Sequence, residues 1–392
     1  MTTEDQQPYK ILVVDDEPDV EPLVLQRMRR QIRAGKYSFV FAQNGVEALE
    51  RLRDDSEIDM VLSDINMPQM DGLTLLEQIS KLDPELRAVI ISAYGDMKNI
   101  RTAMNRGAFD FVTKPIDFED LEVTIERTLA NIVQWREALA SRDKLVAIQN
   151  ELDVASEMQQ SILPIHFPSG RTYQVFASMD PARSVGGDFF DVVRLDNDRV
   201  GLAIADVSGK GVPAALFMMS ARTLLKGAAI GHMEPKSVLT EVNNLLQEDN
   251  ESSMFVTVLY AVYNPETGHL TIANGGHNPP LVIRRDGTSE LLTLSSGLAL
   301  GLMPDFPYEE VVTTLAPGET VVLYTDGVTE AMNSVDEEFG NDRLLGIFAG
   351  GAPKDAQQAS DAVFEAVRNF ADGTPQSDDI TCLILSVGEY QQ

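Results

Sequence analysis

The segment Met60-Val-Leu-Ser-Asp-Ile-Asn-Met-Pro-Gln-Met-Asp-Gly72 joins a short apolar run to a turn and carries the acidic residue Asp64. Its Asp71-Gly72 pair is a typical break, and the next stretch, Leu73–Leu82, has the apolar spacing of a helix. Four other short apolar runs alternate with amphipathic stretches nearby; they are Ile11–Val14, Phe39–Ala42, Ala88–Ile91 and Phe109–Val112. Continuous apolar runs are typical of strands covered on both faces. The first part of the chain is therefore predicted to be a doubly wound, five-stranded parallel sheet flanked by helices.

Length and charge narrow the possible functions. The 392 residues suit two or three domains. The formal net charge of -30 argues against nucleic acid as a direct partner, because binding a phosphate backbone requires clustered Lys and Arg. The single cysteine, Cys382, gives no disulfide framework, and neither a secretory signal nor a run of roughly 18 apolar residues is found. We expect a cytoplasmic protein that contacts neither nucleic acid nor membrane.

Polar side chains follow the predicted strands of this sheet. Because ligands bind beyond the carboxyl ends of parallel strands, these side chains should converge at one edge. Carboxylates packed together repel, so a hard cation such as Mg²⁺ is expected among them. A carboxylate beside Mg²⁺ can accept a phosphoryl group, while Lys114 neutralises charge and the Ser92 hydroxyl donates a hydrogen bond. The residues concerned are Asp15, Asp16 and Glu17 after the first strand, Asp64 after the third, Ser92 after the fourth and Lys114 after the fifth.

Four motifs make residues 8–120 resemble the response-regulator receiver family. They are Val13-Val-Asp-Asp-Glu-Pro18, Leu62-Ser-Asp-Ile-Asn-Met-Pro-Gln-Met-Asp-Gly72, Ile91-Ser-Ala-Tyr94 and Thr113-Lys-Pro115. The resemblance implies a flavodoxin-like domain over residues 1–120 in which a sensor histidine kinase phosphorylates Asp64. It also implies that Asp15, Asp16, Asp64 and the Asn66 carbonyl hold Mg²⁺. Phe111 matches the aromatic switch position beside Ser92 and Lys114; a plain core phenylalanine is the alternative.

Residues 121–163 have a different character. No Gly or Pro occurs between Pro115 and Pro164, which predicts one long helix. Mostly apolar residues recur at steps of three and four in two stripes; these are Leu121, Ile125, Thr128, Ile132, Trp135 and Leu139, then Leu145, Ile148, Leu152, Ala155, Gln159 and Ile162. We interpret this pattern as a coiled coil that joins two domains and forms a parallel homodimer. A helix packed on its own domain is the alternative.

Residues 164–392 are predicted to form an α+β domain, a β-sandwich flanked by helices, because strand runs surround two helical stretches, Val212–Ile230 and Pro235–Asn250. Aspartates follow or precede its apolar strands; they are Asp188, Asp206, Asp326 and Asp378. Each alone could be a turn residue. Together they have the composition of a site for two Mg²⁺ or Mn²⁺ ions. Such a pair of ions, about 3.5–4 Å apart, hydrolyses phosphate esters without a covalent enzyme intermediate.

These aspartates lie in segments that resemble the metal-dependent protein phosphatase family, in particular its SpoIIE-like branch. The resemblance runs from Leu152 to Val387 and includes the lead-in Glu151–Pro164 and the segments Asn274-Gly-Gly-His-Asn-Pro-Pro280 and Leu300-Gly-Leu302. It implies that Asp206 bridges two ions and that the Val207 carbonyl supports one. Asp188 would serve the second ion, and Asp326 and Asp378 the first.

The resemblance also bears on two positions near these aspartates. Arg183 stands where eukaryotic relatives place a phosphate-holding arginine; a surface ion pair is the alternative. Ser208 replaces a histidine that those relatives use as a proton donor, so slower turnover is expected. The loop that contains Asn274, His277 and Asn278 is expected to be structural.

The combined resemblance predicts a response regulator in which Asp64 controls a protein serine/threonine phosphatase. Its substrate would be a phosphoserine or phosphothreonine protein of the anti-sigma-factor-antagonist kind. Phosphorylation would act through the long helix on the helical pair at residues 212–250, with the sign of regulation left open. A catalytically silent adaptor that binds a sigma-pathway protein is the alternative.

Overall fold

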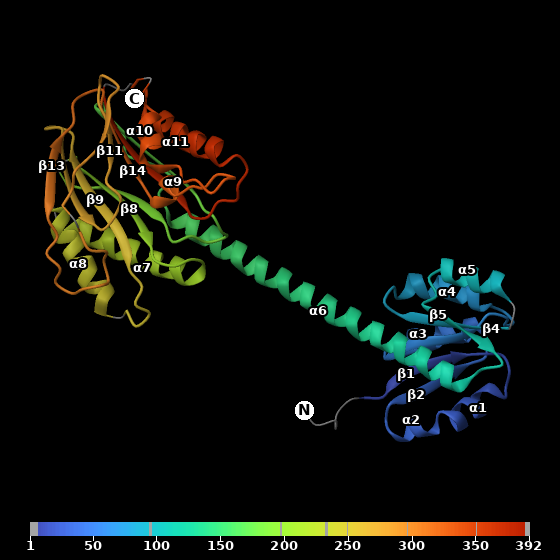
Figure 1. Cartoon of the computed structure of the whole chain (residues 1–392). Helices are drawn as coiled ribbons and strands as arrows, with labels where there is room; N and C mark the ends of the chain where they lie inside the picture. The colour runs from blue at the N-terminus through green and yellow to red at the C-terminus, as the bar shows by residue number, and fades with distance from the viewer. Residues whose placement is uncertain are drawn as a thin grey trace. The chain divides into compact units, whose positions relative to one another are not determined.

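The computed structural model describes residues 7–93, 96–196, 198–231, 234–248, 250–295, 297–349 and 351–388. Tyr94, which closes one of the receiver-like motifs, lies outside these ranges. The chain divides into two compact units, Met1–Ala147 and Ile148–Gln392, which are considered separately below (Figure 1). Within the described ranges, no helix combines the length and apolar character that crossing a membrane requires.

The first unit is a five-stranded parallel sheet in the order β2-β1-β3-β4-β5. Its strands are β1 (Tyr9–Val14), β2 (Tyr37–Ala42), β3 (Ile58–Asp64), β4 (Arg87–Ala93) and β5 (Asp110–Lys114). Its first helices are α1 (Val20–Arg27), α2 (Arg29–Arg33), α3 (Gly45–Asp54), α4 (Gly72–Leu82) and α5 (Met97–Asn105). One core holds residues of α3, α4 and α5, and the other holds residues of α1 and α6 (Phe118–Ile162). The predicted doubly wound, flavodoxin-like fold is confirmed.

The turn before α4 explains why the segment Met60–Gly72 ends in the pair Asp71-Gly72. Asp71 caps the helix by accepting a hydrogen bond from the backbone N–H of Thr74. Gly72 follows directly, and a Cβ atom there would overlap the carbonyl oxygen of Asp64. The Asp-Gly pair therefore lets the chain turn tightly against the end of β3, where Asp64 lies.

Helix α6 is continuous, as the absence of Gly and Pro predicts, and spans Phe118–Ile162. Its first turns belong to the first unit, because Leu121, Ile125 and Ile132 are buried in the core that covers the sheet. This part of the predicted coiled-coil stripe therefore packs on its own domain. A coiled coil and a helix packed on its own domain have the same periodicity, because the periodicity shows which face is apolar and not what covers that face. Leu145, farther along, is 68% exposed.

The second unit contains two antiparallel sheets, in the orders β13-β10-β9-β8-β7 and β12-β11-β14-β15-β6. The first is formed by β7 (Phe189–Arg194), β8 (Val200–Val207), β9 (Val256–Asn264), β10 (His269–Gly275) and β13 (Glu310–Thr314). The second is formed by β6 (Tyr173–Asp180), β11 (Leu281–Ile283), β12 (Ser289–Leu291), β14 (Thr320–Tyr324) and β15 (Ile380–Val387). Figure 1 shows these sheets with helices on their outer sides.

Helices α7 (Val212–Gly231) and α8 (Pro235–Glu248) cover the first sheet, and α11 (Ala356–Ala371) covers the second. Two short helices, α9 (Asp326–Thr329) and α10 (Gly340–Gly346), follow β14. Strand β15 shows the layering, since Leu383 and Leu385 join the core that includes the first sheet, whereas Cys382 and Ile384 join the core that includes α11. The predicted β-sandwich flanked by helices is confirmed.

Candidate functional site

The first unit has an acidic pocket at the carboxyl ends of its strands. Lys114, at the end of β5, places its Nζ 3.0 Å from Asp15 Oδ2, 2.7 Å from Asp64 Oδ2 and 2.9 Å from Glu17 Oε1. Burial alone would lower the pKa of Lys114, but these bonds outweigh burial and raise it above its usual value. Burial raises the pKa of Asp15. The pocket thus holds more negative than positive charge and can accept a cation.

The ligand oxygens of Asp15, Glu17 and Asp64 all lie within 4.8 Å of one another, a spacing that fits one hard cation. Glu17 is the member that the predicted ligand set left out, although its place after β1 was noted. Asp16 and Asn66, which that set included, are exposed. Asp64 itself is buried, and the backbone N–H of Ile65 donates a 2.6 Å hydrogen bond to its Oδ1.

The predicted switch residues lie on β4 and β5, which pair in parallel. Ser92 is buried, and its hydroxyl has no hydrogen-bond partner among the described residues. Phe111 is 37% exposed, so it is not the plain core phenylalanine considered as the alternative. An unpartnered hydroxyl and a partly exposed ring are free to change their contacts when the charge at Asp64 changes.

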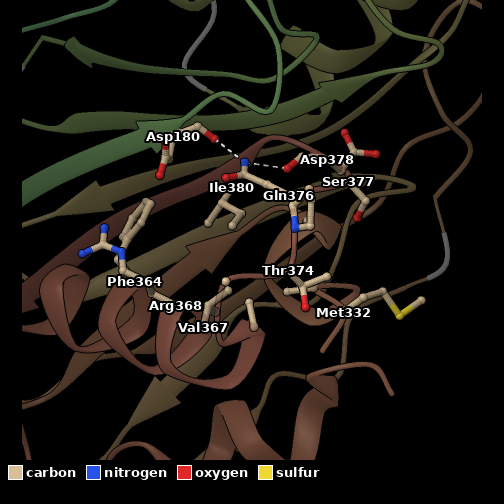
Figure 2. Close-up of a pocket in the computed structure, with 15 residues that line it drawn as sticks. Asp180, Met332, Phe364, Val367, Arg368, Thr374, Gln376, Ser377, Asp378 and Ile380 are labelled. Carbon is tan, nitrogen blue, oxygen red and sulfur yellow. Dashed lines mark hydrogen bonds between the residues drawn. The ribbon is translucent and has the colours of Figure 1, made fainter. Parts of the chain in front are cut away.

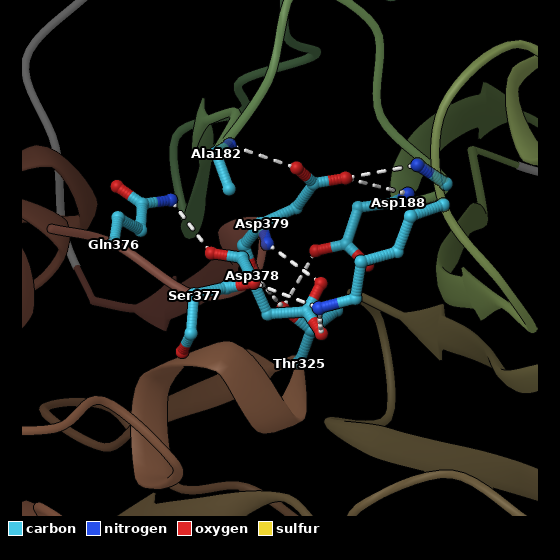
Figure 3. A network of polar contacts seen from close by, with 9 residues as sticks. Ala182, Asp188, Thr325, Gln376, Ser377, Asp378 and Asp379 are labelled. Carbon is cyan, nitrogen blue, oxygen red and sulfur yellow. Dashed lines mark hydrogen bonds and ion pairs between the residues drawn. The ribbon is translucent and has the colours of Figure 1, made fainter.

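In the second unit, both sheets contribute aspartates to one region. Asp188 precedes β7 and Asp206 lies near the end of β8, so these two belong to neighbouring strands of the first sheet. Asp326 begins α9 directly after β14, and Asp378 lies just before β15, in the second sheet. Figure 3 shows Asp188, Asp378 and Asp379 close together where the two sheets meet. The charge of Asp206 acts on Asp188, that of Asp326 on Asp206 and that of Asp378 on Asp326, so the four predicted ligands lie in one region.

The surroundings of these aspartates disfavour unbalanced negative charge. Asp188 is 1% exposed; burial and then the charge of Asp206 raise its pKa. Burial, followed by the charge of Asp326, raises the pKa of Asp206 to about 7. Burial and the charge of Asp378 raise the pKa of Asp326. Clustered oxygen donors that are costly to ionise alone are suited to hard divalent cations such as Mg²⁺ and Mn²⁺.

Two buried threonines fix Asp188. The hydroxyl of Thr325 donates a 2.7 Å hydrogen bond to Asp188 Oδ2, and that of Thr381 donates one of 2.6 Å to the same oxygen. Such hydrogen bonds orient metal-binding carboxylates in proteins.

Lys210 and Asp379 also line this site, and the sequence interpretation missed both. Lys210 Nζ lies 2.7 Å from Asp378 Oδ2. Asp379 is buried and accepts hydrogen bonds from the backbone N–H groups of Ala182, Gly187 and Asp188. It thereby holds the loop that carries Asp188. The Asp378-Asp379 pair was the only available signal, and a sequence does not indicate which of two adjacent aspartates points inward.

The aspartate site is wider than the acidic pocket of the first unit. Among the described residues, Asp15, Glu17 and Asp64 are the only three acidic, histidine or cysteine side chains whose ligand atoms all lie within 4.8 Å. In the second unit, Lys210 lies among the aspartates and forms an ion pair with Asp378. The Val207 carbonyl oxygen lies beside Gly187, where a Cβ atom would come within 2.9 Å of it.

Arg183 is exposed and lines a small cavity together with Asp206, Lys210 and Asp378. Its guanidinium group makes no ion pair within the described parts of the chain, so the surface ion pair considered as the alternative is not observed there. A cation without a partner beside an acidic site is suited to holding an anion.

Ser208 and His277 support the backbone around Asp206. The Ser208 hydroxyl accepts a hydrogen bond from the Phe255 N–H. His277 is buried, its Nδ1 lies 2.9 Å from the Thr257 hydroxyl, and that hydroxyl bonds to the Asp206 carbonyl at 3.4 Å. Burial lowers the pKa of His277 to about 4. Neither side chain is a charged proton donor at neutral pH, and both fix the strand that carries Asp206.

Two family models match the chain. Residues 11–126 match the model described as response regulator receiver domain, and residues 196–388 match the model described as Stage II sporulation protein E (SpoIIE). These matches confirm the combination that the sequence predicts. The chain carries a receiver domain followed by a SpoIIE-like domain of the protein phosphatase 2C type.

Individual relatives agree with this combination. Protein IcfG of Synechocystis sp. is 31% identical over 60% of this chain and 41% of its own length. Phosphoserine phosphatase RsbU of Bacillus subtilis is 30% identical over 54% of this chain and 63% of its own. The chain therefore spans less than two thirds of either relative. The solved SiaA-PP2C domain of Pseudomonas aeruginosa shares the fold, with a TM-score of 0.54 and 24% identity over 63% of this chain and 99% of that domain.

Proposed function

We propose that the second domain, residues 164–392, is a metal-dependent phosphatase that acts on phosphoserine or phosphothreonine in another protein. One observation carries this proposal: aspartates from both sheets, one buried and two half-buried, converge, and their pKa values are raised where no cation balances them. Asp188, Asp206, Asp326, Asp378 and the Val207 carbonyl would hold two Mn²⁺ or Mg²⁺ ions, with Asp206 between them. The ions, when bound, would supply Lewis-acid activation of water and of the phosphoryl group.

Other side chains of the domain would orient the metal ligands and bind the substrate phosphate. Thr325 and Thr381 keep Asp188 oriented, and Asp379 keeps its loop in place. Arg183, at the mouth of the small cavity, would bind oxygens of the phosphate group and align it for in-line attack. Ser208 and neutral His277, which lie near Asp206, cannot protonate the leaving alkoxide as a charged histidine would, so turnover should be slow.

Residues 1–120 would act as the input domain. Asp64 would accept a phosphoryl group from a sensor histidine kinase, with Mg²⁺ held by Asp15, Asp16, Asp64 and the Asn66 carbonyl. The contacts of Lys114 with Asp15 and Asp64 support this assignment. After phosphorylation, Lys114 would pair with the new phosphate oxygens, and Ser92 and Phe111 would change their contacts.

Helix α6 would carry the signal through residues 121–163. Its last turns reach the aspartate site of the second domain, because Gln159 Nε2 donates a 2.7 Å hydrogen bond to the Gly186 carbonyl and Gln159 Oε1 accepts one of 3.0 Å from the Gly186 N–H. Gly186 lies two residues before Asp188. The exposed apolar residues Leu145 and Ile148 on the same helix support a parallel coiled-coil homodimer.

The substrate would be a cytoplasmic phosphoprotein of the anti-sigma-factor-antagonist kind. The similarity to RsbU, named a phosphoserine phosphatase, supports a phosphoserine substrate. The net charge of -30 supports a protein partner and not nucleic acid. A catalytically silent adaptor is the second candidate, and it is favoured by one observation: Lys210 already neutralises Asp378.

Hydrolysis of p-nitrophenyl phosphate by the full chain tests these proposals. We expect activity that requires Mn²⁺ or Mg²⁺, that is lost in the Asp206→Ala, Asp326→Ala double variant, and that changes when beryllofluoride loads Asp64. An Asp64→Ala variant should hydrolyse p-nitrophenyl phosphate at the same rate with and without beryllofluoride. A parent rate no higher than that of the double variant would favour the adaptor, and equal rates with and without beryllofluoride would contradict control by the receiver.

A further inference from the structure

A second hollow in the phosphatase domain adjoins the aspartate site and shares Asp378 with it. Its apolar wall includes Phe364 and Val367 from α11 and Ile380 from β15, and Met332 lies at its edge (Figure 2). None of these side chains takes part in the metal-centred chemistry proposed above. The pocket is therefore a separate feature that opens next to the place where the phosphate would react.

Polar groups at this pocket fix the backbone around it. Gln376 Nε2 donates 2.7 Å hydrogen bonds to the backbone carbonyls of Asp180 and Asp378, which Figure 2 shows as dashed lines. Gln376 thus fixes the segment between the pocket and the metal-binding carboxylate. Arg368 lines the pocket, is exposed, and its guanidinium group has no hydrogen-bond or ion-pair partner in the part of the chain that the structure describes.

The size of the pocket limits what can occupy it. Its volume is about 160 Å³. Pockets for cofactors and drug-sized molecules usually measure about 300–1,000 Å³, whereas an apolar cavity of about 150 Å³ holds a molecule the size of benzene. One apolar side chain fits the space, and a nucleotide does not.

We propose that this pocket is a specificity site that receives one apolar side chain of the phosphoprotein substrate, such as leucine or methionine, close to the phosphorylated residue. The proposal rests on the phosphatase function proposed above. Because Asp378 borders both the pocket and the aspartate site, a chain whose phosphate reaches the aspartates passes the pocket mouth. An extended chain advances roughly 3.3–3.6 Å per residue, so three positions on either side of the phosphoserine reach roughly 10–11 Å from it, and the test covers these positions.

The test fills the pocket from two sides in the full-length protein. Ala371, at the end of α11, and Thr374, in the following loop, both line the pocket and are partly exposed. The variants are Ala371→Phe and Thr374→Phe. Asn369→Phe is the matched control, because Asn369 is an exposed residue of α11 outside the pocket. Melting curves check that each variant is folded.

Each protein is assayed with Mn²⁺ on p-nitrophenyl phosphate and on phosphoserine peptides in which one position, from three before to three after the phosphoserine, is Leu, Met, Gly or Asp. We expect the parent to prefer Leu or Met at one position by about tenfold or more in kcat/KM. Both filled variants should lose this preference and keep the parent rate on p-nitrophenyl phosphate. Asn369→Phe should keep both properties.

Two results would overturn the specificity site: a parent with no preference for an apolar neighbour at any position, or a preference that survives in either folded filled variant. Failure of the proposed phosphatase function would give a different result. In that case the parent itself does not hydrolyse p-nitrophenyl phosphate with Mn²⁺, and the peptide series gives no turnover at all.

Discussion

Lys210 Nζ lies 2.7 Å from Asp378 Oδ2 and donates a second hydrogen bond of 2.7 Å to the carbonyl oxygen of Ser377. A divalent cation on Asp378 has to compete with this ammonium group. We therefore expect Lys210→Met to lower the Mn²⁺ concentration that gives half-maximal hydrolysis of p-nitrophenyl phosphate. Because the Lys210 side chain is 43% exposed, solvent weakens the ion pair and the effect should be about two- to fivefold.

The control for this experiment is Lys354→Met, which removes an exposed lysine that does not line the small cavity around Asp206. It should leave the Mn²⁺ dependence unchanged. A higher half-maximal concentration in Lys210→Met would mean that Lys210 helps to bind the metal, and would contradict the competition.

The raised pKa of Asp206, about 7, makes the stability of the metal-free domain depend on pH. The folded state holds this proton more tightly than the unfolded chain, whose aspartate pKa is about 4. The stabilisation is therefore complete below pH ~4 and is lost as the pH rises through about 7. We expect Asp206→Asn, which cannot ionise, to melt at a higher temperature than the parent at pH 7.5 in EDTA, and this difference to become smaller as the pH falls to 5.

The measured quantity is the difference in melting temperature between variant and parent. This is needed because buried His277 changes the stability of both proteins with pH in the opposite direction. Its pKa is lowered to about 4, so its contribution is present above the unfolded value of about 6.5 and is lost as the pH falls toward 4. His277 is the same in both proteins and cancels. Mn²⁺ should raise the melting temperature of the parent at pH 7.5 and have a smaller effect on Asp206→Asn. A difference between variant and parent that is constant from pH 5 to 7.5 would contradict the assignment.

Thr381 holds Asp188 through its hydroxyl group, at 2.6 Å. We expect Thr381→Val to weaken metal binding or activity by about 10- to 100-fold, because hydrogen bonds that orient metal-binding carboxylates typically contribute this much. Thr381→Ser keeps the hydroxyl and should keep most of the activity. The measurement is kcat together with the half-maximal Mn²⁺ concentration.

Thr320→Val provides the structural control. Thr320 is equally buried, in β14, and its hydroxyl lies 3.0 Å from that of Ser386, on strands of the same sheet. Its loss should reduce stability by about 1 kcal/mol without changing the Mn²⁺ dependence. Equal losses of Mn²⁺ affinity in Thr320→Val and Thr381→Val would show that the effect on the site is indirect.

Most of the fold could be predicted because buried strands leave a clear signal. The apolar runs placed β1–β5 close to their observed positions, and the topology of a parallel sheet then brought Asp15, Asp64 and Lys114 together. Strand β13 (Glu310–Thr314) was not predicted. It is an edge strand with little buried surface, and its Val312 is 59% exposed, so it has no continuous apolar run to recognise.

The details of the aspartate site were harder to predict for a different reason. Asp379 was passed over in favour of Asp378, although Asp379 accepts three backbone hydrogen bonds. Thr381 and Lys210 were not recognised either. Each of these roles depends on which way a side chain points after distant segments have come together, and Asp379 and Ala182 are 197 residues apart. Periodicity in one segment contains no information on such contacts.

A buried ion pair fixes helix α7 to strand β7, since Arg222 Nη2 lies 3.0 Å from Asp191 Oδ2 and both side chains are at most 10% exposed. We expect Arg222→Met to reduce the stability of this domain by about 3–5 kcal/mol, because it removes the ion-pair partner of the buried Asp191 carboxylate. Arg142→Met, which removes an exposed pair with Asp143, should cost less than about 1 kcal/mol. Urea unfolding measures both changes.

The double variant Asp191→Leu, Arg222→Met should recover most of the lost stability. Burial raises the pKa of Asp191 despite the neighbouring charge of Arg222, which means that the attraction between the two groups does not fully offset the cost of removing the carboxylate from water. Replacement of both charges by apolar side chains removes that cost, and in other buried pairs such replacements are neutral or stabilise by about 1–4 kcal/mol. If the double variant is instead as unstable as Arg222→Met alone, removal of the buried carboxylate brings no recovery, and the desolvation cost of Asp191 is small.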